Sequence, residues 1–341
     1  MDIREALERL TNGEHLSREE ARDVFDIIMA GEATPAQIGG VLMALRTAGE
    51  TAAEIAGAAE AMRAVSLKVD VAAPHLVDTA GTGGSGSAKL FNISTAAAFV
   101  AAASGAQVAK HGNRGMTSAS GSADVLEAAG VDLSLDPEQI ARCITEVGIG
   151  FMFAQMHHSA MRHAGPVRQE LGVRTVFNLL GPLTNPANAK RQVIGVFAPA
   201  WQRTMGEVAA LLGAEHVLIV HSDGLDELSV AGYSQVVECR AGEITEYSVH
   251  PRDFGMSTHS TGALHAGSPG ESLALIGAAF GRNNEAAADV VALNAGAAIY
   301  ASGVALSLAD GVAMAQDAIA SGMAAERLRE FARLSSLMSG Q

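Results

Sequence analysis

Apolar residues recur every three to four positions over the first 70 residues, which is the spacing of helices with one buried face. A first helix is expected from about Ile3, and three more helix starts carry a capping side chain. These starts are two capping boxes and a capping threonine before proline: Ser17 with Glu20, Thr51 with Glu54, and Thr34 before Pro35. Gly31 and Gly49 follow the second and third periodic segments, where a left-handed residue ends a helix. The pattern predicts a small bundle of four antiparallel helices.

Beyond Pro74, short apolar runs alternate with helical segments, which is typical of an α/β domain. The predicted strands are residues 76–77, 107–109, 150–154, 193–197 and 217–220. Because helices separate them, the sheet is expected to be mostly parallel. Residues 234–249 alternate around a break at Ala241 and Gly242, which predicts an antiparallel edge hairpin. The fold class is therefore α/β, with a small N-terminal helical domain before a large α/β domain.

The composition narrows the possible partners. The chain has 341 residues, which is longer than most domains built around a single hydrophobic core. Its residues are 48% hydrophobic but only 4% aromatic, which indicates a globular interior of small aliphatic side chains. A formal net charge of −14 disfavours nucleic acid and anionic membranes, which attract basic surfaces. The two cysteines, Cys143 and Cys239, are too few for a disulfide scaffold, and neither a targeting leader nor a run of about 18 apolar residues occurs. We expect a cytoplasmic protein that captures any polyanionic substrate through local features.

Residues 78–124 hold the richest candidate chemistry. A glycine cluster, Gly81-Thr82-Gly83-Gly84-Ser85-Gly86, follows a predicted strand, and Asn92-Ile93-Ser94-Thr95 opens a predicted helix. Glycines allow backbone N–H groups to face an anion, and a helix start adds its positive dipole end. Pyrophosphate would fit such a turn, although a glycine turn between a strand and a helix also serves ordinary packing.

A cationic segment, Lys110-His111-Gly112-Asn113-Arg114, ends the next predicted strand. Residues 115–122 after it are small and have little apolar surface, so they are predicted to form a mobile loop. The cations and hydroxyls of this region would cover a phosphorylated ligand and exclude water. The alternative is a solvated surface loop.

Two adjacent carboxylates, Asp226 and Glu227, follow the predicted strand 217–220 and a turn at Ser222-Asp223-Gly224. Ligands of α/β sheets bind at the carboxyl ends of strands, and carboxylate oxygens hold Mg²⁺ together with water and phosphate oxygens. Mg²⁺ is therefore the predicted cofactor, and an exposed acidic turn is the alternative.

Histidines and one arginine complete the candidates. His157, His158 and His163 lack the spacing and the neighbours of a transition-metal site, which favours an aromatic or polar contact. Arg168 lies on a predicted helix and offers a planar fork to a substrate carboxylate, with a surface salt bridge as the alternative. Nucleotide kinases and dehydrogenases fit poorly, because there is no Walker-type phosphate loop and no Gly-x-Gly-x-x-Gly with the expected acidic residue after it. The sequence also shows no nucleophile triad.

Taken together, these residues resemble the anthranilate phosphoribosyltransferase family over nearly the whole chain. The motifs that carry the resemblance are Gly81-Thr82-Gly83-Gly84, Asn92-Ile93-Ser94-Thr95, Lys110-His111-Gly112-Asn113-Arg114, Ser120-Gly121-Ser122-Ala123-Asp124, His157-His158, Pro166-Val167-Arg168, Asn178-Leu179-Leu180-Gly181-Pro182-Leu183-Thr184-Asn185-Pro186 and Gly224-Leu225-Asp226-Glu227. Each is weak alone, but eight in this order are specific. The resemblance implies a helical domain of residues 1–72, joined by residues 165–188, and an α/β domain of residues 73–164 and 189–341. It also implies a homodimer contact through the small domain and an active site at the hinge.

The reaction implied by the resemblance joins the amine of anthranilate to the phosphoribosyl group of phosphoribosyl pyrophosphate (PRPP) in tryptophan biosynthesis. The residues implied for PRPP are Gly81, Gly84, Ser85, Asn92, Ser94, Thr95, Lys110, Asn113, Ser118 and Ser122. Those implied for anthranilate are Gly81, His111, Asn113, His158, Arg168 and Pro182, and those for Mg²⁺ are Ser94, Asp226 and Glu227. Two departures affect the pyrophosphate side: Ser85 replaces a usual aspartate, and segment 87–90 is longer by one residue, with Leu90 where threonine is common.

Phosphoribosyl transfer needs positioning and charge neutralisation, and it requires no covalent enzyme nucleophile. The amine of anthranilate is unprotonated near neutral pH, so His111 or a water is expected to take its proton only afterwards. A rival reading is a pyrimidine nucleoside phosphorylase, which shares the two-part plan but has a different signature rich in lysine and serine. A rival from another class is a catalytically silent relative that binds nucleic acid, which the net charge disfavours.

Overall fold

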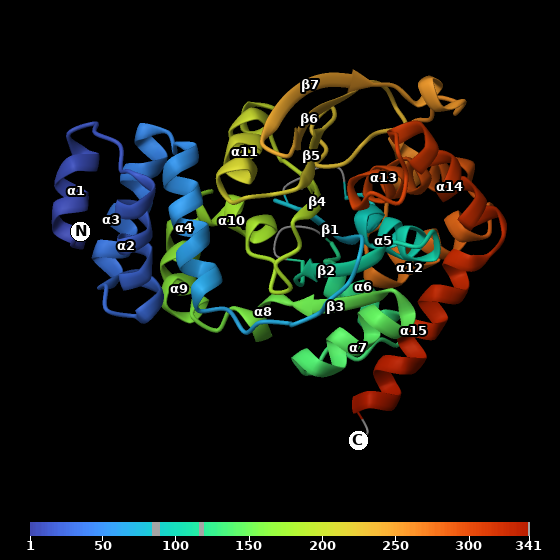
Figure 1. Ribbon diagram of the computed structural model, residues 1–341, viewed down its shortest axis with the longest axis horizontal. Helices are drawn as coiled ribbons and strands as arrows, with labels where there is room; N and C mark the ends of the chain where they lie inside the picture. The colour runs from blue at the N-terminus through green and yellow to red at the C-terminus, as the bar shows by residue number, and fades with distance from the viewer. Residues whose placement is uncertain (84–88, 116–118, 340–341) are drawn as a thin grey trace.

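The computed structural model describes residues 1–83, 89–115 and 119–339, and it begins with the predicted helical bundle (Figure 1). The four helices are α1 (Ile3–Thr11), α2 (Arg18–Ala30), α3 (Pro35–Ala48) and α4 (Ala52–Ala64). The predicted caps are confirmed, because Ser17, Thr34 and Thr51 each accept the backbone N–H three residues ahead. Gly31 ends α2 in the left-handed region at φ 77°, and Gly49 follows α3 at φ 84°.

Seven strands form one sheet in the order β3-β2-β1-β4-β5-β6-β7. The strands are β1 (Leu76–Gly81), β2 (Gln107–Gly112), β3 (Ile149–Phe153), β4 (Arg191–Gly195), β5 (His216–His221), β6 (Ser234–Arg240) and β7 (Glu243–Val249). Pairing is parallel from β3 through β5 and antiparallel from β5 to β7, which confirms the predicted sheet and its edge hairpin. Because β2 and β3 extend the sheet on one side of β1 and β4 on the other, the strand order reverses between β1 and β4. A crevice for ligands opens at such a point, outside the carboxyl ends of the strands.

Helices cover both faces of the sheet (Figure 1). The remaining helices are α5 (Ile93–Ala103), α6 (Ser122–Ala128), α7 (Pro137–Val147), α8 (Ala154–His157), α9 (Met161–Leu171), α10 (Phe177–Leu183), α11 (Ala200–Leu211), α12 (Pro269–Phe280), α13 (Glu285–Ser302), α14 (Leu308–Ala320) and α15 (Met323–Ser339), with short 3-10 turns η1 (Pro251–Phe254) and η2 (Thr261–Leu264). Alternate residues of β5 enter different cores: Leu218 and Val220 pack with α5 and α13, whereas Val217 and Ile219 pack with α11. The hydrophobic core around α11 is continuous with the core of the bundle, so the bundle packs against this side of the sheet.

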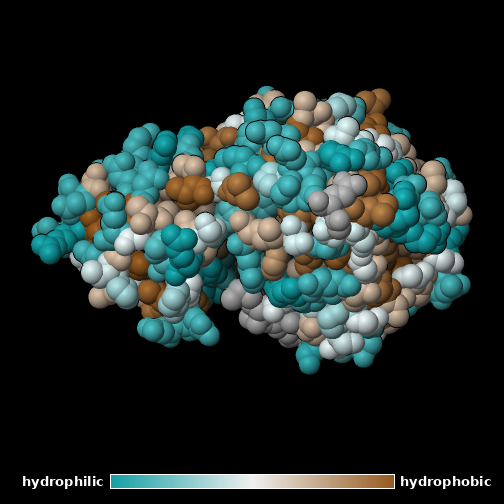
Figure 2. Space-filling view, turned by 90° about the horizontal axis from the view of Figure 1, so that it is seen from below, coloured by the Kyte–Doolittle hydropathy of each residue, from teal (hydrophilic) through white to brown (hydrophobic). Residues whose placement is uncertain are grey.

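Two later helices return to the bundle. Helix α9 contacts α2 and α3, and α10 contacts both α4 and β1. Val167 of α9 and Phe177 of α10 are buried in the core of the bundle. Seen from below, the bundle and the larger part meet at a notch in the surface (Figure 2). The chain between β3 and β4 therefore links the two parts of the molecule.

Both cysteines, Cys143 and Cys239, are buried and free. Burial raises the pKa of each thiol, so neither is a reactive thiolate at neutral pH. Across the described part of the chain, every helix is too short or too polar to span a bilayer.

Candidate active site

The carboxyl ends of β1 and β4 form the floor of a polar pocket at the reversal point of the sheet. Gly81 and Gly195 are the last paired residues of these two strands. The pocket is lined by Thr79, Ala80, Gly81, Ser94, Ala97, Val193, Gly195, Asp226, Glu227 and Asn294. It therefore brings together Gly81, Ser94, Asp226 and Glu227 of the predicted site, at the place where an open α/β sheet binds its ligand.

The acidic turn after β5 lies directly over the two glycines of the pocket floor. A Cβ atom at Gly195 would be 1.7 Å from the carbonyl oxygen of Asp226, and one at Gly81 would be 2.7 Å from its Oδ2. The backbone contact at Gly195 admits only glycine, whereas a side chain at Gly81 would displace the Asp226 carboxylate. The hydroxyl of Ser222 donates to the carbonyl oxygen of Glu227 at 2.6 Å and closes the turn. One function of Gly81 is therefore to make room for the carboxylates.

Glu227 connects the acidic turn to the start of α5. Its Oε1 accepts the N–H of Ser94 at 3.2 Å, which places the carboxylate at the positive end of the helix dipole. Burial, followed by the neighbouring Asp226, nevertheless raises the pKa of Glu227 to about 8. A divalent cation would relieve this repulsion, and two carboxylates beside a serine hydroxyl are the hard oxygen donors that Mg²⁺ prefers. The residues present therefore fit the predicted cofactor.

Lys110 lies inside the sheet, whereas the sequence suggested that its charge belongs to a surface loop that covers the ligand. It belongs to β2 and is only 2% exposed. Its Nζ donates to the carbonyl oxygen of Thr79 at 2.5 Å and to the Thr79 hydroxyl at 3.3 Å. Burial lowers the pKa of Lys110, and the negative charges of Asp78 and Glu227 oppose that shift. The strand therefore fixes a buried cation beside Thr79, a residue of the pocket wall.

His111 is a neutral hydrogen-bond acceptor in this structure. Its backbone N–H donates to Asp78, which also accepts from Asn185, and its Nδ1 donates to the carbonyl oxygen of Gly181 at 3.1 Å. The Nε2 atom then carries no proton, and it has no hydrogen-bond partner among the described residues. Burial, with a smaller effect of His158 at a ring distance of 5.0 Å, lowers the pKa of His111 to about 3. Such a weakly basic imidazole favours water, the other acceptor expected from the sequence, as the group that takes the amine proton.

Arg168 lies half-buried on α9, with its guanidinium carbon 5.2 Å from the centre of the Phe177 ring. Burial lowers its pKa, and within the described ranges it forms no salt bridge. Among these residues, the surface salt bridge considered as its alternative is therefore not formed. Phe177 and Gly181 are about one turn apart on α10, and Gly181 contacts His111. Arg168 and His111 thus both contact α10, the short helix that contains Pro182.

The ends of the cationic loop are fastened to the first turn of α6. The carboxylate of Asp124 accepts the N–H groups of Gly115 and Gly121 at 2.9 and 2.8 Å. Arg114 forms salt bridges with Asp124 and Glu127. The positive charge of Arg114 is therefore engaged by α6, which leaves Lys110 as the cation of this segment nearest the pocket.

Other residues predicted for PRPP surround the starts of α5 and α6. The side-chain amide of Asn92 donates to the carbonyl oxygen of Ser120 at 3.2 Å. The hydroxyl of Ser122 approaches the carbonyl oxygen of Asn113 at 3.4 Å, and the hydroxyl of Thr95 is buried without a partner among the described residues. The predicted site residues outside the described part of the chain are Gly84, Ser85 and Ser118, and so is the middle of the predicted mobile loop, residues 116–118.

The altered segment after the glycine cluster can be followed from Lys89 onward. Lys89 is exposed at φ 43°, and its carbonyl oxygen accepts the N–H of Ala266 at 2.9 Å. Leu90 pairs with His265 as an isolated antiparallel bridge. The segment is therefore tied to the loop before α12 by its backbone, and the Lys89 side chain is open to solvent.

Sequence analysis assigned no individual role to four residues that support this site: Asp78, Asn185, Gly195 and Asn294. Asp78 carried a usable signal, since a charged residue inside an apolar strand must be hydrogen-bonded when buried. Gly195 carried another, because glycine inside a strand often marks a close approach of backbone. Asn294, within an alanine-rich helix, carried the weakest signal.

Comparison with known proteins covers both parts of the chain. Residues 4–66 match the helical bundle domain and residues 73–325 match the a/b domain of a glycosyl transferase family. The fold and the site therefore define a two-part glycosyl transferase. The anthranilate phosphoribosyltransferase of Cellvibrio japonicus is 57% identical over 337 residues, covering 97% of this chain and 98% of that protein. That of Teredinibacter turnerae is 56% identical over 335 residues, with the same two coverages. The chain belongs to the anthranilate phosphoribosyltransferase family.

Solved structures agree with this assignment. Anthranilate phosphoribosyltransferase from Thermus thermophilus superposes with a TM-score of 0.91 at 46% identity, covering 97% of this chain and 99% of its own. The Saccharomyces cerevisiae enzyme, in complex with PRPP and Mg, has a TM-score of 0.88 at 26% identity and covers 98% of both chains. The same yeast enzyme in complex with 4-fluoroanthranilate has a TM-score of 0.87.

Proposed function

We propose that this protein transfers the phosphoribosyl group of PRPP to the amine of anthranilate, a step of tryptophan biosynthesis. A bond forms between the amine nitrogen and the ribose C1, the bond from C1 to pyrophosphate oxygen breaks, and the amine proton passes to water. The observation that carries the proposal is the pocket in which Asp226 and Glu227 face the start of α5 at the reversal point of the sheet. Similarity over nearly the full length to anthranilate phosphoribosyltransferases supports the choice of substrates.

The pyrophosphate side of the site is assigned to the starts of α5 and α6 and to β2. The proposed PRPP residues are Gly81, Gly84, Ser85, Asn92, Ser94, Thr95, Lys110, Asn113, Ser118 and Ser122. The N-terminal N–H groups of α5 suit a polyanion, and the buried ammonium group of Lys110 supplies the positive charge that the overall −14 does not.

Mg²⁺ is assigned to Ser94, Asp226 and Glu227. When bound, it neutralises charge on the departing pyrophosphate. The protein holds the two carboxylates in one tight turn and orients Glu227 through the N–H of Ser94.

Anthranilate is assigned to the region around α10, with Gly81, His111, Asn113, His158, Arg168 and Pro182 as its proposed contacts. Arg168 has no salt-bridge partner in the described structure and suits the substrate carboxylate. The bare Nε2 of His111 suits an N–H of the amine, so that the nitrogen lone pair is left to face the ribose. Orientation would then contribute more than base catalysis, because the amine is weakly basic.

The assembly is assigned from the same resemblance. The protein is proposed to be a cytoplasmic homodimer joined through the small domain. The proposed domains are residues 1–72 with 165–188, and residues 73–164 with 189–341. The contacts of α9 and α10 with the bundle support this division.

The direct test is loss of anthranilate fluorescence on incubation with PRPP and Mg²⁺, together with identification of the product. We expect turnover that stops when Mg²⁺ is chelated, and the double variant Asp226→Ala/Glu227→Ala should lose nearly all of it. Phosphorolysis of a pyrimidine nucleoside without any anthranilate turnover would instead favour the phosphorylase reading. Wild-type kcat and Mg²⁺ dependence in the double variant would refute the metal assignment.

A further inference from the structure

The acidic turn is tied to α13 through one buried amide. Asn294 of α13 lines the pocket and is 3% exposed. Its Oδ1 accepts the backbone N–H of Leu228 at 2.9 Å, and its Nδ2 donates to the carbonyl oxygen of the same residue at 2.8 Å. Leu228 directly follows Glu227, so this side chain holds both backbone polar groups of the residue that ends the acidic turn.

The amide of Asn294 has no hydrogen left for a ligand. Its Nδ2 also donates to the carbonyl oxygen of Val290, one turn earlier in α13, at 2.8 Å. Both amide hydrogens are then in use, and the side chain is fixed in one orientation. The remaining acceptor oxygen is unsuited to an anionic pyrophosphate. Asn294 is therefore bonded to the acidic turn through Leu228, and its amide has no hydrogen to donate to the pyrophosphate.

Besides the N–H of Ser94, other contacts support the acidic turn. The strand ends lie below Asp226 at Gly81 and Gly195, and the hydroxyl of Ser222 closes the turn on itself. Asn294 adds the connection to α13. Ser222 precedes the two carboxylates in the chain, whereas Leu228, which Asn294 binds, follows them. Residues that orient metal ligands in this way typically affect metal affinity by about 10- to 100-fold.

We propose that Asn294 is a positioning residue that fixes the Asp226 and Glu227 carboxylates for Mg²⁺ and pyrophosphate, an inference that rests on the proposed function. Without its amide, the backbone of Leu228 loses both hydrogen bonds to α13, and the two carboxylates before it lose their common orientation. Because buried amides also stabilise the fold, the effect on the metal must be separated from a general loss of stability.

Gln202 offers a matched control. It is 4% exposed and its amide also donates to two backbone carbonyl oxygens, those of Ile219 and Gln235, at 3.0 and 2.8 Å. Its helix, α11, packs in the other core, and its amide is bonded to β5 and β6 and not to the acidic turn. The variants Asn294→Ala and Gln202→Ala should therefore both lower Tm, but only the first should affect the metal.

The readout is the binding of PRPP at a series of Mg²⁺ concentrations, measured by calorimetry without anthranilate so that no turnover occurs. Asn294→Ala is expected to need about 10-fold more Mg²⁺ than wild type for half-maximal PRPP binding. Gln202→Ala should stay within about twofold of wild type. The same Mg²⁺ dependence in both variants would overturn the inference, whereas a wild-type protein that neither binds PRPP nor consumes anthranilate would overturn the proposed function.

A milder change keeps the inference testable if Asn294→Ala does not fold. Ser222→Ala removes only the hydroxyl that closes the same turn on Glu227. It should raise the Mg²⁺ requirement in the same direction by a smaller factor. A folded Ser222→Ala variant with the wild-type requirement would show that the orientation of the turn does not control metal binding.

Discussion

The carboxyl group of Glu227 holds its proton more tightly in the folded chain than in the unfolded one. Its pKa rises from 4.5 to about 8 because it is buried beside Asp226. A carboxyl whose pKa is raised by folding contributes stability fully below its unfolded pKa, and that contribution is lost as pH rises through the folded pKa. In the absence of Mg²⁺, this group should therefore lower Tm as pH rises between about 5 and 9.

The variant Glu227→Gln isolates this effect, because glutamine has the same shape and no titration. Without Mg²⁺ we expect it to equal wild type near pH 5 and to exceed the wild-type Tm by a few degrees at pH 9. Added Mg²⁺ at pH 9 should raise the Tm of wild type more than that of the variant. Calorimetry with and without a chelator measures both differences. Parallel Tm curves for the two proteins would show that Glu227 does not titrate in this range.

Arg168→Ala tests the proposed partner of the anthranilate carboxylate. Loss of a charge-assisted pair costs about 1.5–3 kcal/mol, so KM for anthranilate should rise by about 10- to 100-fold while KM for PRPP stays within about twofold. Arg162→Ala is the control, because Arg162 is an exposed arginine of the same helix. Steady-state kinetics in both substrates provide the measurement. An equal rise in both KM values, or the same change in Arg162→Ala, would count against the assignment.

The place of a single residue in the site could be predicted from the sequence where its neighbours in the chain form a recognisable element. The pair Asp226 and Glu227 stands next to a clear strand, so its place at the edge of the sheet was predictable. The state of Lys110 and His111 was not, because their burial and hydrogen bonds depend on partners distant in sequence. Charge and protonation at this site follow from tertiary packing and not from local pattern.

At the scale of elements, the bundle depends on one very close approach of two helices. A Cβ atom at Gly57 of α4 would be 2.2 Å from the carbonyl oxygen of Arg18 and 2.8 Å from the backbone nitrogen of Arg22 in α2. The backbone of α2 cannot yield as a flexible side chain would. The variant Gly57→Ala should therefore lower the free energy of unfolding by about 1–3 kcal/mol.

Gly277→Ala is the control for this change. Gly277 lies inside α12, and no atom lies within 4 Å of a Cβ placed there. Alanine at that position should stabilise the protein by about 0.5–1 kcal/mol, because it favours the helix without a clash. Denaturant unfolding of both variants measures the two changes in the free energy of unfolding, which should have opposite signs. A Gly57→Ala variant with the free energy of unfolding of wild type would mean that α2 and α4 can move apart without loss of stability.

The elements themselves were largely predictable. The caps at Ser17, Thr34 and Thr51 are local hydrogen bonds, and local chemistry is what sequence displays. The position of β4 beside β1 was not predictable in the same way, because strand order is decided by which apolar faces pack together across the whole chain. That order creates the reversal point, so the geometry of the pocket required the structure.

At the scale of the whole molecule, the bundle shares a hydrophobic core with α11 and the sheet, and it forms one end of the protein (Figure 1). Its two-part organisation was visible in the change of apolar period after Pro74. Its assembly was not, since a stripe of apolar residues does not reveal which surface covers it. The proposed homodimer is therefore the feature of the whole molecule that most needs a direct measurement.

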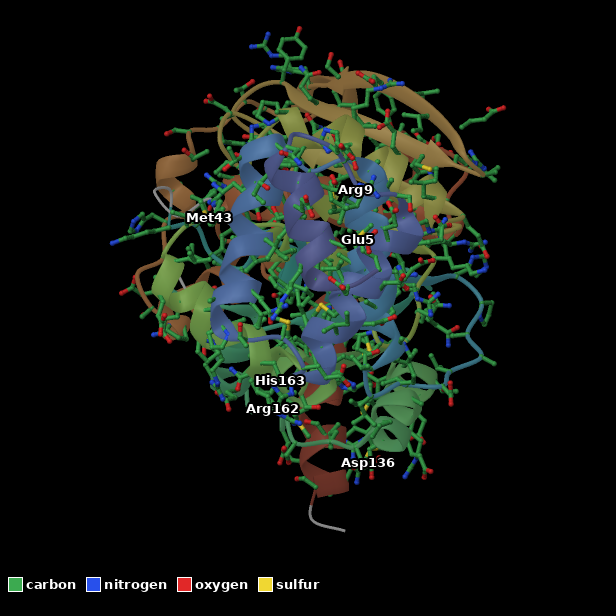
Figure 3. The ribbon with its side chains drawn as sticks, turned by 90° about the vertical axis from the view of Figure 1, so that its left-hand side faces the viewer. Glu5, Arg9, Met43, Asp136, Arg162 and His163 are labelled. Carbon is green, nitrogen blue, oxygen red and sulfur yellow. The ribbon has the colours of Figure 1, made fainter. Side chains whose placement is uncertain are left out.

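The outward face of the bundle is the proposed dimer contact. Figure 3 looks onto this face, with Met43 of α3 and Glu5 and Arg9 of α1 labelled. Met43 is half-buried, so it presents part of an apolar side chain to a partner. In a twofold contact the same residue occurs on both subunits, and a glutamate introduced at this position would be buried twice.

Met43→Glu should therefore weaken the dimer by about 100-fold or more, because charges placed in an apolar contact cost several kcal/mol. Sedimentation equilibrium should give twice the mass of one chain for wild type and a concentration-dependent mixture for the variant. Leu337→Glu supplies the matched control: Leu337 is 55% exposed on α15, at the other end of the molecule from the bundle, and this variant should stay dimeric. A monomeric wild type would refute the homodimer. A Met43→Glu dimer as tight as wild type would place the contact on another face, while monomers in both variants would indicate general destabilisation and not a local contact.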